Sequence, residues 1–108
     1  MQVNRLEKLL EFIKNEPNEP FLKYALATEY LRLNQTDKAL QYYEDLANNH
    51  PDYIGTYYHL GKLYEALNRR DDAINTYETG MKITREQRDN HAFSELQAVY
   101  NQLTDDDY

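Results

Sequence analysis

A 34-residue internal repeat is the feature of this sequence that most limits how it can fold. Residues 20–53 align without gaps with residues 54–87, and nine of the 34 pairs are identical, where unrelated sequences would share roughly two. The identical pairs are Tyr24 with Tyr58, Leu26 with Leu60, Tyr30 with Tyr64, Leu33 with Leu67, Asn34 with Asn68, Asp37 with Asp71, Ala39 with Ala73, Tyr43 with Tyr77, and Glu44 with Glu78. A repeat of this length is one structural unit that buries its apolar face against its copy, so we expect an array of stacked units.

Each repeat carries the signals of two helices joined by a tight turn. In the first repeat, apolar residues recur at steps of three and four from Leu22 to Leu33, which predicts an amphipathic helix. Asn34 and Asn68 follow that helix, where a left-handed cap is wanted and Asn tolerates it. The second helix is expected over residues 37–49 and 71–83, and Pro51 ends the first hairpin because it cannot continue a helix.

The starts and crossing points of these helices can also be predicted. Asn18 and Asp52 precede the first helix of each repeat and are the expected N-caps. Small residues occur where two helix axes must approach closely, and large side chains fill the space around them. These small residues are Ala27 and Gly61 on the first helices, and Ala39 and Ala73 on the second.

The segments on either side of the two repeats extend the pattern. Residues 5–17 carry an apolar stripe and end in Pro17, 34 residues before Pro51, which is typical of a second helix. Residues 93–103 reproduce the spacing of a first helix, displaced by two residues from the strict period. We therefore expect about six helices.

These residues resemble the tetratricopeptide repeat (TPR), a 34-residue helical hairpin with preferred residues at eight places. The second repeat matches at Tyr57, Leu60, Gly61, Tyr64, Ala73, Tyr77 and Gly80, with Arg85 in place of the final proline. The first matches at Leu26, Ala27, Tyr30, Ala39, Tyr43, Leu46 and Pro51, with Lys23 in place of a bulky aromatic residue. The resemblance implies an all-α fold, a right-handed α-α superhelix with two full repeats and flanking half-repeats. It implies a single TPR-like domain over residues 1–103, followed by an acidic, disordered tail over 104–108.

In proteins of similar sequence, the first helices line a concave groove that binds a peptide or a partner helix. The places that line it map onto Phe21, Tyr24, Thr28, Leu31 and Arg32, then onto Gly55, Tyr58, Lys62, Glu65 and Ala66, and finally onto His91, Ser94, Ala98, Asn101 and Gln102. From these the resemblance implies a partner-binding set of Phe21, Tyr24, Thr28, Leu31, Arg32, Tyr58, Lys62, Glu65 and His91. Tyr24 and Tyr58 are the expected aromatic anchors, although tyrosines at these places can equally pack one hairpin on the next.

Some family members bind the C-terminal carboxylates of chaperones through a clamp of Lys, Asn and Arg. Here Tyr24, Thr28 and His59 occupy places of that clamp, so the resemblance does not imply a chaperone-tail adaptor.

Composition excludes several classes of function. The net charge of −7 opposes binding to nucleic acid and to anionic membranes, and the absence of cysteine excludes thiolate metal sites and thiol nucleophiles. The N-terminal residues mix acidic and basic side chains, unlike a signal peptide, so a cytoplasmic location is expected. His50, His59 and His91 lack the spacing that puts two metal ligands on one helical face, and three glycines are too few for a phosphate-binding loop. We expect no cofactor, no metal and no catalysis.

Two alternatives to a groove-binding module remain open. The chain could be a structural module that self-associates through the outer faces of its terminal helices, as a weak homodimer rather than a monomer. Polar residues on those faces, among them Glu7, Glu11 and Gln97, oppose this reading. An enzymatic alternative would require His59, His91 and an acid within hydrogen-bond reach, about 3 Å.

Overall fold

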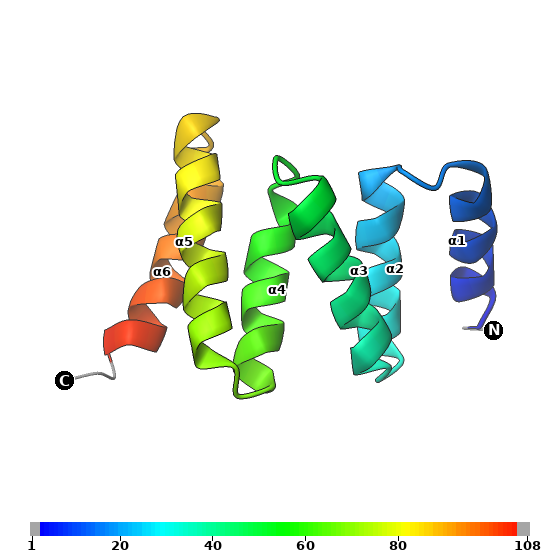
Figure 1. Cartoon of the computed structure of the whole chain (residues 1–108), viewed down its shortest axis with the longest axis horizontal. Helices are drawn as coiled ribbons and strands as arrows, with labels where there is room; N and C mark the ends of the chain where they lie inside the picture. The colour runs from blue at the N-terminus through cyan, green and yellow to red at the C-terminus, as the bar shows by residue number, and fades with distance from the viewer. Residues whose placement is uncertain (1–2, 106–108) are drawn as a thin grey trace. The chain divides into compact units, whose positions relative to one another are not determined.

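The computed structural model describes residues 3–105 and contains six α-helices in that range, with no strand among the described residues (Figure 1). The helices are α1 (Val3–Asn15), α2 (Pro20–Arg32), α3 (Thr36–Asn49), α4 (Gly55–Ala66), α5 (Arg70–Glu86) and α6 (Asn90–Asp105). The all-α class and the helical hairpins expected from the sequence are confirmed.

The chain divides into two compact units, Met1–Tyr53 and Ile54–Tyr108, and the boundary between them coincides with the boundary between the repeats. In the first unit, α2 packs against both α1 and α3. In the second unit, α5 packs against both α4 and α6. Each repeat therefore completes its hairpin within one unit, α2 with α3 and α4 with α5.

In each hairpin, the small residues predicted to lie at helix crossings are part of the buried core. Ala27, Ala39 and Ala73 are fully buried, as expected for close helix crossings. Gly61 on α4 lies against the ring of Tyr77 on α5, so close that a Cβ atom at position 61 would overlap the ring. The absence of a side chain at Gly61 is what allows these two helices to meet at this distance.

Three turns in the chain share one conformation. Asn34 and Asn68 have positive φ angles of 62° and 59°, which confirms the predicted left-handed caps. Arg88, between α5 and α6, has a φ of 59° as well. After each of these residues, the next backbone N–H bonds to the carbonyl five residues earlier, as from Asp89 to Thr84 at 2.9 Å. The link from α5 to α6 is thus a tight turn of the same kind as the turns inside the two hairpins.

Several predicted boundaries were wrong. Helix α5 continues three residues beyond 83, to Glu86, because Arg85 replaces the proline that ends α3. The N-cap of α2 is Glu19, whose side chain accepts a hydrogen bond from the Phe21 amide at 3.3 Å, and not Asn18. The N-cap of α4 is Ile54, without a side-chain cap, and not Asp52.

The C-terminal boundary also differs in detail from the expected one. Helix α6 continues to Asp105, two residues into the segment expected to be a tail. The rest of that segment, residues 106–108, lies outside the described residues.

Candidate functional site

The predicted groove residues of the first unit include two exposed or half-exposed aromatic side chains on α2. Phe21 is 58% exposed. Tyr24 is half-buried, and its ring centroid lies 5.7 Å from that of Tyr53 and 6.4 Å from that of Tyr43. Tyr24 therefore belongs to an aromatic cluster of its own unit, with part of its surface open to solvent.

Two other predicted groove residues of this unit have partners inside the fold. The hydroxyl of Thr28 lies 3.2 Å from that of Tyr43, which is fully buried. Arg32 pairs with the carboxylate of Glu29, donating through Nε to Oε1 at 3.1 Å. Glu29 is only 3% exposed, and Arg5 on α1 approaches it at 3.4 Å.

The Arg32 side chain is held in place by its ion pair with the Glu29 carboxylate. The hydrogen bond from Arg32 outweighs burial and, with the positive charges of Arg32 and Arg5, holds the pKa of Glu29 below its usual range. Arg32 compensates a buried charge, so it contributes to folding whether or not a partner binds. Leu31, next to it, is half-buried.

An ion pair between a buried lysine and a half-buried aspartate in the first unit was not foreseen from the sequence. Lys23, which stands where the repeat favours an aromatic residue, is 6% exposed, and its Nζ lies 2.7 Å from Asp45 and 3.5 Å from Nε2 of His50. Burial acts to raise the pKa of Asp45, but hydrogen bonds from Lys23 and Asn49 lower it on balance. The corresponding residues 34 positions later are Tyr57, Thr79 and Thr84, all uncharged.

In the second unit, α4 and α6 line a cleft of about 360 Å³. Its lining residues are Ile54, Gly55, Tyr58, His59, Ala92, Glu95 and Leu96. Tyr58 is 37% exposed, and its ring meets the imidazole of His59 edge to face, with centroids 5.6 Å apart. This cleft brings a predicted anchor, Tyr58, together with residues of another helix.

Glu95 is the functional candidate that the sequence reasoning missed. Its side chain is 56% exposed at the cleft, and its Oε1 lies 3.7 Å from Nε2 of His91, which is itself 86% exposed. Burial lowers the pKa of His59, although the charge of Glu95 acts in the opposite direction. The only sequence signal for Glu95 was its position one helical turn after His91.

The remaining predicted residues of this unit form a small network on α4 and α5. The hydroxyl of Tyr77 donates a hydrogen bond to the carboxylate of Glu65, and Lys62 lies 4.0 Å from the same carboxylate. Burial, and then the hydrogen bond and charge of Glu65, raise the pKa of Tyr77. Glu65 thus accepts a hydrogen bond from Tyr77, the tyrosine whose ring packs on Gly61. The Lys62 side chain, which is 46% exposed, lies near the Glu65 carboxylate.

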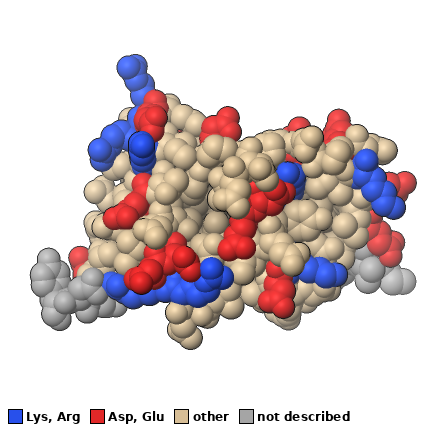
Figure 2. Space-filling view, viewed as in Figure 1, with Lys and Arg blue, Asp and Glu red and all other residues tan. Residues whose placement is uncertain are grey.

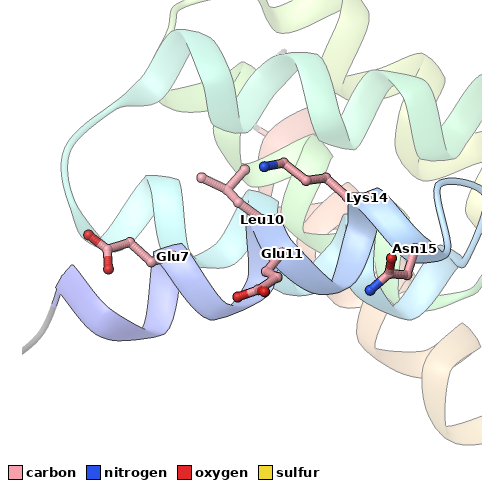
Figure 3. Close-up of a pocket in the computed structure, with 5 residues that line it drawn as sticks. All are labelled: Glu7, Leu10, Glu11, Lys14 and Asn15. Atoms are coloured by element: carbon pink, nitrogen blue, oxygen red, sulfur yellow. The ribbon is translucent and has the colours of Figure 1, made fainter.

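Two further hollows lie away from the predicted groove residues. The one in Figure 3 is lined by a single helix, α1, through Glu7, Leu10, Glu11, Lys14 and Asn15. The other, of about 460 Å³, lies between α5 and α6 and includes Met81, Phe93 and Tyr100. Arg85 lies over the ring of Phe93, 4.9 Å from its centroid, and partly covers that apolar surface.

Among residues 3–105 there is no group of three His, Asp or Glu side chains placed to hold a metal ion. On the face in Figure 2, Lys and Arg side chains lie in small groups beside Asp or Glu. Over the same described range, no helix combines the length and the apolar character that a membrane span requires.

Comparison with known proteins decides the family. The family model described as tetratricopeptide repeat matches residues 30–100, which is more than half of the chain. The chain belongs to the tetratricopeptide repeat family. No match was found among the curated proteins.

Several solved structures are similar in fold to this TPR chain. A tetratricopeptide repeat domain protein from Salinibacter ruber is 48% identical, with 82% of this chain and 89% of that chain covered and a TM-score of 0.78. A protein from Bordetella parapertussis is 24% identical, with 94% and 89% covered and a TM-score of 0.79. The TPR2B domain of yeast Sti1, solved in a complex with pHsp70, is 15% identical, with 97% and 84% covered and a TM-score of 0.85. The TPR fold is, in general, that of a protein-interaction module.

Proposed function

We propose that this TPR chain is a non-catalytic interaction module that binds a peptide or a partner helix through the exposed surfaces of its first helices. One observation carries the proposal: an exposed aromatic side chain, Tyr58, lines a cleft between α4 and α6. Partly buried aromatic residues beside a pocket are the usual anchors of protein interfaces. The complex of the yeast Sti1 domain with pHsp70 supports use of the fold for binding.

The contacts divide the predicted binding residues into two groups. Thr28, Arg32 and Glu65 each bond to a buried group of their own unit, so we assign them mainly to folding. Phe21, Tyr24, Leu31, Tyr58, Lys62 and His91 keep exposed or half-exposed surface and are the proposed contacts. The absence of cysteine suits a reducing compartment such as the cytoplasm.

Self-association through terminal helices is the weaker alternative. In the repeat register, Arg5 on α1 corresponds to Ala39, 34 residues later, and Gln97 on α6 corresponds to Gly61, 36 residues earlier. Ala39 and Gly61 are the small residues at which two helices of a hairpin meet closely. Each terminal helix therefore carries a large polar side chain at the place where a further packing partner would need a small one. We therefore propose a monomer. Sedimentation velocity over a hundredfold range of concentration should show a single monomeric species, and a concentration-dependent dimer would contradict it.

Selection from a random library of 12-residue peptides displayed on phage tests the binding proposal. The immobilised chain should enrich peptides that bind the wild type and lose affinity at least tenfold for Tyr58→Ala or Tyr24→Ala. Tyr100→Ala is the matched control, because Tyr100 lies on α6 in the separate α5–α6 hollow and should leave binding unchanged. Circular dichroism melts of all variants separate lost binding from lost folding.

Two results would oppose the proposal. Failure to enrich any peptide would contradict it. So would binding that is lost only in proportion to unfolding of the tyrosine variants.

A further inference from the structure

The α4–α6 cleft has an apolar interior that can accept an uncharged side chain. Leu96, 2% exposed, forms part of its lining together with Ile54 and Ala92. The ring of Tyr58 adds a flat, partly exposed aromatic surface. An aliphatic or aromatic side chain inserted here would remove apolar surface from water.

The charge at the cleft has one sign. Of the seven lining residues, Glu95 carries the only full charge at neutral pH, because burial favours the neutral form of His59. Tyr58 and Glu95 line the same cleft, and a cation bound there can be attracted both by the carboxylate charge and by the quadrupole of the aromatic ring. The net charge of −7 adds a long-range attraction for basic segments.

The fold of the chain itself shows how one arginine can use a tyrosine ring and a carboxylate together. On α5, the guanidinium of Arg69, at its N-cap, lies over the ring of Tyr64 at 4.5 Å from the centroid and donates through Nε to Asp72 at 2.8 Å. A planar guanidinium can stack on a ring and donate to a carboxylate together, which a lysine ammonium does less well. Tyr58 and Glu95 offer the same two groups to a residue from outside.

On the basis of the proposed function, we infer that this cleft binds a peptide that inserts an apolar side chain between α4 and α6 and places a neighbouring arginine on Tyr58 and Glu95. The partner is a basic-apolar segment of a protein. This chemistry is opposite in charge to an acidic C-terminal tail.

The peptides from the phage selection provide the first test. Enriched sequences should share an apolar residue within about two positions of an arginine, as the spacing of adjacent side chains on an extended chain requires. Enrichment of acidic or uncharged peptides that still depend on Tyr58 would overturn this inference and leave the interaction module standing. The two proposals therefore fail in different ways.

Affinity measurements on the most enriched arginine peptide provide the second test. With a fluorescein-labelled copy of that peptide in fluorescence polarisation, Glu95→Gln should weaken binding about five- to tenfold, because glutamine can still accept a hydrogen bond but lacks the charge that strengthens it. Tyr58→Ala should weaken it more than tenfold, and Tyr58→Phe should preserve it. Replacing the arginine of the peptide by glutamine should weaken binding more than Glu95→Gln does, because it also removes the contact with the Tyr58 ring. Its effect should be smaller in the Glu95→Gln variant than in the wild type, because the two changes remove a shared ion pair.

Glu86→Gln is the matched control for charge. Glu86 is an exposed residue on α5 that lines the hollow between α5 and α6. Glu86→Gln therefore changes the net charge by the same amount as Glu95→Gln but leaves the α4–α6 cleft intact. It should change the affinity less than twofold. Equal losses for Glu86→Gln and Glu95→Gln would show general electrostatic attraction and overturn the inference, as would arginine peptides that bind Tyr58→Ala normally.

Discussion

The hydroxyl of Thr56 has no hydrogen-bond partner among the described residues, although the residue is fully buried on α4. A buried hydroxyl without a partner costs about 1–3 kcal/mol of desolvation free energy. The corresponding residue in the first repeat is Leu22, which has no such group to satisfy.

Thr56→Val should therefore stabilise the chain. Valine keeps the branched shape and removes the hydroxyl, so the free energy of unfolding should rise by about 1 kcal/mol. Urea denaturation followed by circular dichroism measures this change. Thr84→Val serves as the control, because the buried Thr84 hydroxyl donates to the Gly80 carbonyl at 2.9 Å, and its loss should not stabilise. A destabilised Thr56→Val variant would contradict the prediction.

Gly61→Ala tests the close contact between α4 and α5. Alanine favours a helix by about 1 kcal/mol over glycine, but overpacking against a fixed neighbour costs about 1–3 kcal/mol. Tyr77 cannot move aside easily because it is fully buried and its hydroxyl is bonded to Glu65. We expect the cost of overpacking to exceed the gain in helix propensity, so that the free energy of unfolding falls by about 1 kcal/mol.

The same urea experiment reads out this change. A net gain in stability would show that the Tyr77 ring repacks. In the first repeat, the fully buried Ala27 occupies the corresponding place, and Ala27→Gly should lower stability by about 0.5–1 kcal/mol through helix propensity and further through the loss of a buried methyl group.

At the scale of elements, the turn between α5 and α6 contains the least suited residue of the three left-handed turns. Arg88 adopts a φ of 59°, where a non-glycine residue costs about 1–2 kcal/mol and where asparagine is better tolerated. The two homologous turns use Asn34 and Asn68.

Arg88→Asn should thus stabilise the turn by about 0.5–1 kcal/mol, and Arg88→Gly by a similar amount. Thermal unfolding of both variants measures the gain. Glu86→Ala is the control, because Glu86 is an exposed residue at the end of α5 and its substitution does not alter the left-handed turn. No change in either Arg88 variant would mean that its side chain compensates for the backbone conformation.

The sequence predicted the helices well because their signals are local. Spacing of apolar residues, the two asparagine caps and the small residues at the crossings each act within one hairpin, and the structure confirms them. The end of α5 was predicted three residues too early. The prediction copied the length of the second helix of the first repeat and did not allow for Arg85, which stands in place of Pro51 and lets the helix continue. The cap at Glu19 was missed because an acid in place of Asn is a less specific signal.

The candidate site was harder to predict than the fold. Periodicity identifies the exposed face of one helix, but it cannot show which side chains meet across helices. Thr28 and Glu65 were expected to contact a partner, and their bonds to Tyr43 and Tyr77 depend on packing between helices. Glu95 lines the cleft from α6, whose apolar pattern is displaced by two residues from the strict repeat period.

At the scale of the molecule, the two repeats differ in how they should respond to acid. The first contains two carboxylates, Glu29 and Asp45, whose pKa values are lowered by their partners. The second has Leu63 and Thr79 at those places. A carboxylate with a lowered pKa stabilises the folded state above its unfolded value, about 3.9–4.3, and this contribution is lost as the pH falls through the folded pKa.

We expect the first repeat to lose stability before the second below about pH 4. Hydrogen-exchange mass spectrometry, with protection factors corrected for the intrinsic rate at each pH, should show α2 and α3 losing protection ahead of α4 and α5. Glu29→Leu, which introduces the residue of the second repeat, should reduce this difference. Equal loss in both repeats would contradict the assignment.

The ion pair of Lys23 with Asp45 has a consequence for how the chain finds its fold. Two halves with so many shared residues could exchange partners, with α2 closing on α5 in place of α3. Such a mispaired hairpin would bury the Lys23 ammonium beside Thr79, with no carboxylate to neutralise it, and an uncompensated buried charge is strongly destabilising. We therefore expect the Lys23–Asp45 ion pair, which has no counterpart in the second repeat, to favour the pairing of α2 with α3 over its pairing with α5.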